Sequence, residues 1–177
     1  MLKEYLKASK TWVEDYLKEV LNSPNTEYEK LYESMRYSLL MGGKRIRPIL
    51  TKAVMESFGV SPEPYKEIVC AIELIHTYSL IHDDLPAMDN DDYRRGNLTN
   101  HKVYGDGLAV LAGDGLLTYA FQLICQNKAA TPEQHLKCVL ALAKAAGPEG
   151  SGRGAGLRFI VGRTSHSTVG TASAPSR

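Results

Sequence analysis

Apolar residues recur at helical spacing along most of residues 1–146. This repeat at i, i+3 and i+4 predicts a first amphipathic helix, which should end at Asn22-Ser23-Pro24-Asn25 because these residues favour turns. The same spacing predicts helices over about 27–40, before Gly42-Gly43, and over about 48–58. The first stretch with this spacing carries Tyr5, Leu6, Trp12, Val13, Tyr16, Leu17, Val20 and Leu21.

The later part of the chain continues the helical pattern. A helix is expected from about Ser61 toward His82, and Pro86 should end or kink it because proline has no N–H to donate. Residues 106–125 are apolar on most sides, which is typical of a central helix. Thr131 is the expected N-cap of a last helix. No stretch alternates convincingly between apolar and polar residues, so the sequence predicts an all-α bundle.

The composition changes abruptly near residue 150. Residues 1–150 carry 17 Lys and Arg against 20 Asp and Glu, whereas residues 151–177 carry four Arg and no acid. The second segment also holds five Gly and eight Ser or Thr, without usable periodicity. We therefore expect a helical domain over 1–150 and a disordered Gly/Ser/Arg-rich tail over 151–177. The tail's composition resembles translation in a shifted reading frame more than a natural continuation of the fold.

The totals exclude several classes of protein. The net charge is +1, which gives no argument for nucleic-acid binding. No uninterrupted apolar stretch reaches about 18 residues, so no membrane span is expected. The N-terminal residues mix charged and apolar side chains, unlike a signal peptide. The three cysteines lack the spacing of a metal or redox site, which favours a reducing cytoplasm.

An acidic run, Asp83-Asp84-Leu85-Pro86-Ala87-Met88-Asp89, is the first candidate for chemistry. Clustered carboxylates repel one another, and a cation among them removes that cost. Carboxylate oxygens suit magnesium, which also keeps positions for water and substrate phosphate. A helix end distorted at Pro86 could turn Asp83 and Asp89 toward one cavity, with Asp84 in support. The alternative interpretation is an acidic helix cap.

Basic residues elsewhere complement the acidic run. Lys44, Arg45 and Arg47 lie in the glycine-rich segment 42–48, and Arg94-Arg95 precede Gly96. Arginine forks and lysine point charges suit diphosphate oxygens. A basic turn alone is more often a solvated surface, but its combination with an acidic metal motif favours a diphosphate site. His76 lies about two helical turns before Asp83, so it could face the same cavity, or it could be purely structural.

Three segments together resemble the trans-prenyl diphosphate synthases, most closely the bacterial farnesyl diphosphate synthases. They are residues 42–48, residues 76–89 and Arg94-Arg95-Gly96, and the resemblance covers about 1–150. It implies the N-terminal part of the all-α prenyl synthase (terpenoid synthase) bundle, normally a homodimer. It also implies condensation of an allylic diphosphate with isopentenyl diphosphate to a longer trans-prenyl diphosphate, with Mg²⁺.

The resemblance assigns roles to individual residues. Asp83 and Asp89 would bind magnesium with support from Asp84, and Arg94 would hold the allylic diphosphate. Tyr78, beside the small Ser79, would form the floor of the product pocket and imply a fifteen-carbon, farnesyl product. The alternative for Tyr78 is an ordinary core position. The isopentenyl diphosphate would be held by Lys44, Arg47, His76 and Arg95.

The chain also departs from that family. A second aspartate-rich motif on a later helix should face the first, yet no acidic residue follows residue 150. We therefore expect a truncated bundle with an uncovered apolar face on residues 106–125, poor solubility or rescue by a partner, and little or no synthase activity.

Two other classes of function compete with this interpretation. One is a non-catalytic diphosphate-binding or partner subunit, which the missing second motif would suit. The other is a metal-dependent phosphohydrolase, because His82-Asp83 resembles an HD pair. The hydrolase interpretation leaves the basic segments unexplained.

Overall fold

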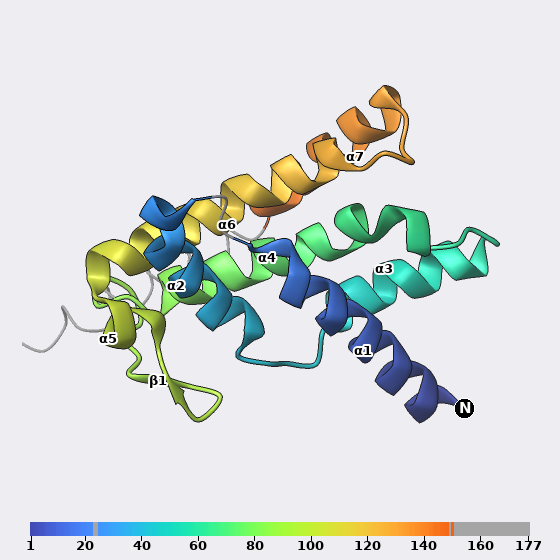
Figure 1. Ribbon diagram of the computed structural model, residues 1–177. Helices are drawn as coiled ribbons and strands as arrows, with labels where there is room; N and C mark the ends of the chain where they lie inside the picture. Colours follow the sequence, from blue (N-terminus) through green and yellow to red (C-terminus); the bar gives the residue numbers. More distant parts are fainter. Residues whose placement is uncertain (23–24, 149, 151–177) are drawn as a thin grey trace, which may run out of the picture. The chain divides into compact units, whose positions relative to one another are not determined.

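The computed structural model describes residues 1–22, 25–148 and 150. Helices dominate these residues, which confirms the expected all-α class. The predicted tail, 151–177, lies outside the described residues. The elements in chain order are α1 (Leu2–Val20), η1 (Thr26–Tyr28), α2 (Glu29–Leu40), α3 (Ile46–Ser57), η2 (Glu63–Tyr65), α4 (Lys66–Asp83), β1 (Tyr93–Arg94), β2 (Asn97–Leu98), α5 (Asn100–Tyr104), α6 (Asp106–Gln126) and α7 (Pro132–Ala146) (Figure 1).

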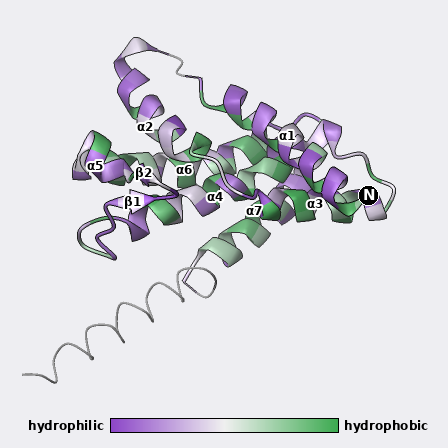
Figure 2. Cartoon of the chain, turned by 90° about the horizontal axis from the view of Figure 1, so that it is seen from below, coloured by the Kyte–Doolittle hydropathy of each residue, from purple (hydrophilic) through white to green (hydrophobic). Residues whose placement is uncertain are grey.

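The chain divides into two units, residues 1–140 and 141–177. In the first unit, α4 and α6 lie side by side and make its most extensive helix–helix contact (Figure 1). Buried residues of α6 include Ala109, Ala112, Leu116 and Ala120, those of α4 include Val69, Leu74 and Ile81, and Figure 2 shows many hydrophilic residues on α1 and α2. The contacts of α6 with α4, α2 and α5 agree with the prediction of a central helix over 106–125. In the second unit, the structure describes the end of α7 and residues 147, 148 and 150.

Apolar side chains are nevertheless exposed on several helices of the first unit, α6 and α3 among them. On α6, Val110 and Leu111 face solvent, as the sequence led us to expect. A larger stripe runs along α3 to its C-cap, where Leu50, Val54 and Phe58 are 59%, 55% and 81% exposed at a spacing of four residues. Among the described helices, only α6 is long and apolar enough to cross a membrane, a test that the core helix of a soluble protein also passes.

A short hairpin corrects the expectation that the chain has no strands. β1 and β2 pair antiparallel, with Tyr93 opposite Leu98 and Arg94 opposite Asn97. The two residues of the turn, Arg95 and Gly96, have φ values of 55° and 83°. Positive φ at both central positions is the geometry of a type I′ turn, which matches the twist of paired strands. Strands of two residues are too short to produce an alternating pattern, so the sequence did not reveal them.

Buried hydrogen bonds connect the start of α5 to α2. The side-chain oxygen of Asn100 accepts from Ser34 Oγ at 2.9 Å, and its amide nitrogen donates to Ser38 Oγ at 2.8 Å. Just before it, the buried Thr99 hydroxyl donates to the carbonyl of Asp91 at 2.7 Å. Burying a polar group lowers folding stability unless the group is hydrogen-bonded, so these bonds hold the hairpin in one position against α2.

The helix ends follow local sequence signals. The predicted N-cap at Thr131 is confirmed: its Oγ1 accepts from the backbone N of Gln134 at 3.3 Å. Gln134 Oε1 accepts in return from the backbone N of Thr131 at 2.8 Å, which completes a capping box. α3 begins at Ile46, two residues before the expected Pro48, so that the proline lies in the first helical turn, where its missing N–H is tolerated.

Candidate diphosphate and metal site

The acidic run forms the loop that follows α4. The helix ends at Asp83, three residues before Pro86, and the backbone N of Asp89 donates to the carbonyl of Asp83 at 2.8 Å. Asn90 has a φ of 54°, in the left-handed region that asparagine tolerates. The loop thus folds back so that the backbones of the two outer aspartates of the run are hydrogen-bonded, with Asp83 half-buried and Asp89 exposed.

Asp84 differs from the two outer aspartates because it is buried, with 3% of its surface exposed. Both of its oxygens accept from Arg94 Nε, at 2.8 and 2.9 Å, and Oδ1 also accepts from Arg94 Nη2 at 2.5 Å. The hydrogen bond with Asp84 raises the pKa of Arg94. The pair therefore links the end of α4 to β1. Arg94, assigned to the allylic diphosphate by resemblance, already has this carboxylate as a partner.

The donor set fits magnesium only in a particular way. Within the part of the chain that the structure describes, no group of three or more His, Cys, Asp or Glu side chains could hold a metal ion. Magnesium, however, is commonly bound by one or two carboxylates, with water and substrate phosphates completing the shell. Asp83 and Asp89 could supply those carboxylates, so the residues fit a magnesium ion shared with a diphosphate.

A cavity of about 480 Å³ collects the predicted isopentenyl diphosphate residues. Three segments contribute to it: the loop between α2 and α3, the middle of α4, and the turn of the hairpin. Lys44, Arg47 and Arg95 are exposed, and His76 is half-buried. We call it the cationic cavity, and its lining residues are Gly43, Lys44, Arg45, Ile46, Arg47, Glu73, His76 and Arg95.

Glycine explains how the hairpin reaches this cavity. Gly42 and Gly43 have φ values of 90° and 139°, which glycine adopts without the steric cost that other residues incur. Arg95 Nη1 donates to the carbonyl of Gly42. A Cβ at Gly43 would lie 2.6 Å from the same Nη1, closer than real Cβ contacts. The missing side chain thus makes room for the Arg95 guanidinium beside the loop.

Arg45 corrects the grouping of three basic residues in segment 42–48. Its side chain is 2% exposed and forms an ion pair with Glu73, Nη1 to Oε1 at 2.9 Å. Its backbone is left-handed, with a φ of 52°, and it immediately precedes α3. The positive charge of Arg45 is therefore engaged within the protein, unlike the exposed charges of Lys44 and Arg47.

His76 should make folding sensitive to acid. Burial, and next the charge of Arg47, lower its pKa below the ordinary 6.5. Because the unfolded chain then binds the proton more readily, the free energy of unfolding should fall as the pH drops below about 6.5. In the His76→Gln variant, the part of this fall in unfolding free energy that comes from His76 should be absent. Denaturant titrations between about pH 8 and about pH 5 measure it, and identical pH profiles for both proteins would contradict it.

His82 lies against α6. Its Nε2 is 3.2 Å from the carbonyl oxygen of Val110 and 3.7 Å from Asp114 Oδ1. The ring of Tyr78 meets it edge-on, with centroids 5.7 Å apart. Ser79 Oγ donates to the carbonyl of His76 at 2.9 Å. Tyr78, the proposed chain-length residue, is half-buried and contacts His82, which directly precedes Asp83.

The packing of His82 requires a glycine on α6. A Cβ at Gly113 would lie 2.1 Å from His82 Nε2. The Gly113→Ala variant should therefore lose about 1–2 kcal/mol of unfolding free energy, since overpacking displaces the ring. Gly107→Ala is the matched control on the same helix: a Cβ there would meet nothing within 4 Å, so helix propensity should leave stability equal or higher. Equal thermal unfolding of both variants would contradict the contact.

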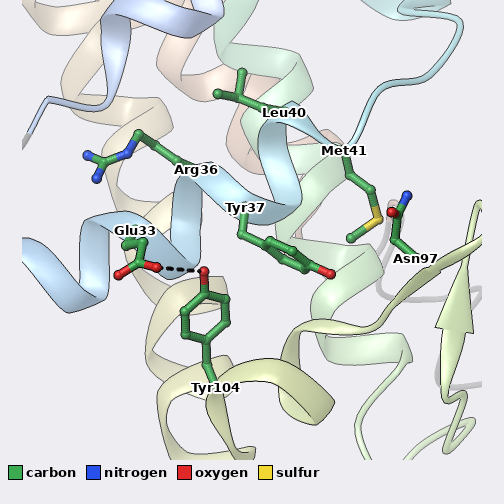
Figure 3. A pocket seen from close by; sticks show the side chains of 7 residues that line it. All are labelled: Glu33, Arg36, Tyr37, Leu40, Met41, Asn97 and Tyr104. Atoms are coloured by element: carbon green, nitrogen blue, oxygen red, sulfur yellow. Dashed lines mark hydrogen bonds between the residues drawn. The ribbon is translucent and has the colours of Figure 1, made fainter.

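A second cavity, of about 560 Å³, lies beside α2 and α5 (Figure 3). Tyr37 and Tyr104 meet there edge-on with centroids 5.5 Å apart, and the Tyr104 hydroxyl donates to Glu33 at 3.2 Å. Its one lining cation, Arg36, donates to the carbonyl of Leu21 at 2.8 Å and to Glu29. Although it is larger, this aromatic cavity lacks the clustered cations of the cationic cavity. Sequence reasoning did not identify it, because no motif marks its residues.

Comparisons with known proteins identify similar sequences. The Polyprenyl synthetase family matches residues 28–152. Farnesyl diphosphate synthase of Geobacillus stearothermophilus is 58% identical over 123 residues, which cover 68% of this chain and 41% of that protein. Dimethylallyltranstransferase of Fischerella ambigua is 50% identical over 150 residues, covering 84% and 43% respectively.

A solved structure extends the likeness to the fold. The crystal structure of an FPP/GFPP synthase from Zymomonas mobilis superposes with a TM-score of 0.86 at 38% identity, covering 99% of this chain and 60% of that one. The chain spans about two fifths of the length of the two curated relatives. Because the family match covers well over half of its residues, this chain belongs to the polyprenyl synthetase family.

Proposed function

We propose that the chain serves trans-prenyl transfer by binding two diphosphates. Isopentenyl diphosphate would occupy the cationic cavity, and an allylic diphosphate would bind at Asp83 and Asp89 through Mg²⁺. The observation that supports this proposal most is the convergence of Lys44, Arg47 and Arg95 with His76 around one cavity. Exposed cations in a concave site are what a diphosphate requires, and arginine can bind its oxygens in pairs.

The reaction requires two charged diphosphate-binding regions and a reaction site from which water is excluded. The allylic carbon–oxygen bond breaks, diphosphate leaves, and the cation is attacked by the double bond of isopentenyl diphosphate, which then loses a proton. Magnesium, when bound, would neutralise charge that develops on the leaving diphosphate. The chain's own cations hold the second diphosphate in place, which gives the positioning that a bimolecular reaction needs. An apolar surround would keep water from quenching the cation.

Calorimetric titration of the purified chain tests this proposal. Isopentenyl diphosphate should bind without metal, whereas dimethylallyl diphosphate should need Mg²⁺. Asp89→Asn should abolish the Mg²⁺-dependent binding of dimethylallyl diphosphate. Asp92→Asn is the control, because Asp92 instead pairs with Lys102 at 2.8 Å. Absence of saturable isopentenyl diphosphate binding would contradict the assignment of the cationic cavity.

Product length is a finer proposal that rests on Tyr78 and Ser79. Similar proteins include ones named farnesyl diphosphate synthase and geranylgeranyl diphosphate synthase. The bulk of the half-buried Tyr78 ring favours the shorter, farnesyl product. Residues 151–177 contain no Asp or Glu that could form a second aspartate-rich, magnesium-binding motif, so we expect little turnover from this chain alone. Chromatography of products from both substrates with Mg²⁺ tests both expectations.

A non-catalytic diphosphate-binding subunit is the second candidate. The exposed apolar stripe of Leu50, Val54 and Phe58 favours it, since such surfaces commonly bind another protein. Diphosphate binding without turnover, together with turnover after a prenyl synthase partner is added, would distinguish this function from that of a self-sufficient enzyme. A homodimeric assembly and a cytoplasmic location stay predictions.

A further inference from the structure

The wall of the cationic cavity contains a buried ion pair. Arg45 and Glu73 have side chains that are 2% and 3% exposed, and Arg45 Nη1 donates to Glu73 Oε1 at 2.9 Å. Arg45 Nη2 donates to the carbonyl of Leu39 at 2.8 Å. A single guanidinium therefore connects the end of α2, the start of α3 and the middle of α4.

This ion pair lies between the groups assigned to the ligand. Lys44 directly precedes Arg45, and Arg47 follows it by two residues. On α4, Glu73 precedes His76 by three residues, so their side chains share one helix face. Both also line the cationic cavity. The geometry of the pair consequently sets how far the cations of the loop lie from His76.

The pair also controls the charge of the cavity. Glu73 is the one carboxylate among its lining residues, which include four cationic side chains. An unpaired carboxylate there would repel a diphosphate and attract Arg47 or Arg95, because charges interact strongly at low effective dielectric. Arg45 engages Glu73 inside the protein. The other cations that line the cavity are Lys44, Arg47 and Arg95.

We propose that Arg45 and Glu73 are positioning residues for isopentenyl diphosphate. They hold the loop of residues 42–47 against α4 and neutralise the cavity's own carboxylate, without contacting the ligand. This inference rests on the proposed function, because the ligand is the one assigned there to the cationic cavity.

Isopentenyl diphosphate titrations of four proteins test the inference: wild type, Arg45→Gln, Glu73→Gln and the double variant. Arg45→Gln should bind at least about tenfold more weakly, because the loop loosens and Glu73 is left unpaired. Adding Glu73→Gln to Arg45→Gln should raise the isopentenyl diphosphate affinity by at least about threefold, which is the coupling that a double-mutant cycle measures. An Arg45→Gln affinity within about twofold of wild type would overturn the inference. Glu29→Gln, which breaks an ion pair with Arg36 outside the cavity, is the control.

A second measurement covers the case in which Arg45→Gln does not fold. Arg45→Lys keeps the charge but cannot donate to both Glu73 and Leu39 in the same fork geometry. It should bind at least about threefold more weakly and speed amide exchange in residues 42–47, while α4 and α6 stay protected. Wild-type affinity and exchange in Arg45→Lys would overturn the positioning role alone. Failure of the wild-type chain to bind isopentenyl diphosphate would instead overturn the proposed function, and this inference with it.

Discussion

Arg47→Ala should weaken isopentenyl diphosphate binding by about 10- to 100-fold. A hydrogen bond to a charged group contributes about 1.5–3 kcal/mol, and each 1.4 kcal/mol is a tenfold change in affinity. Arg47 is exposed at the cationic cavity, so its removal should cost little folding stability. Calorimetry gives the affinity, and circular dichroism confirms that the helices persist.

The control for this variant lies in the aromatic cavity of Figure 3. Arg36→Gln removes that cavity's one lining cation and should leave isopentenyl diphosphate affinity unchanged. The two cavities have similar volumes, so the comparison separates clustered charge from size as the cause of binding. A loss in Arg36→Gln with no loss in Arg47→Ala would move the site to the aromatic cavity.

Arg94→Met should lower the free energy of unfolding by about 3 kcal/mol. The substitution leaves the buried Asp84 carboxylate without its bidentate partner, and an uncompensated buried charge is strongly destabilising. Chemical denaturation monitored by circular dichroism measures the change.

A double variant separates the lost ion pair from lost packing. Replacing both partners by apolar residues, as in Asp84→Leu with Arg94→Met, should recover most of the stability, because no charge is then left buried. A double variant as unstable as Arg94→Met would show that the ion pair is not the cause. Titration of Arg94→Met with dimethylallyl diphosphate and Mg²⁺ tests separately whether Arg94 also contacts a diphosphate.

The amino-acid sequence alone is enough to predict the helices and the residue types of the candidate site. Helical periodicity is a local signal, so α1, α4 and α6 could be predicted from the spacing of apolar residues alone. The acidic run and the basic segments also carry their chemistry in residue type, because carboxylates suit magnesium and guanidinium groups suit diphosphate. The hairpin was missed because strands of two residues have no periodicity to detect.

Which charges are exposed at the cavity depends on the tertiary structure. Arg45 and Arg47 look equivalent in the sequence, yet one is buried against Glu73, 28 residues away, and the other faces the cavity. Asp84 similarly separates from Asp83 and Asp89 because the hairpin brings Arg94 to it. Burial and ion pairing depend on segments distant in the chain. A motif can therefore indicate a candidate site, but burial and ion pairing in the fold determine which of its charged groups are exposed and which are paired within the protein.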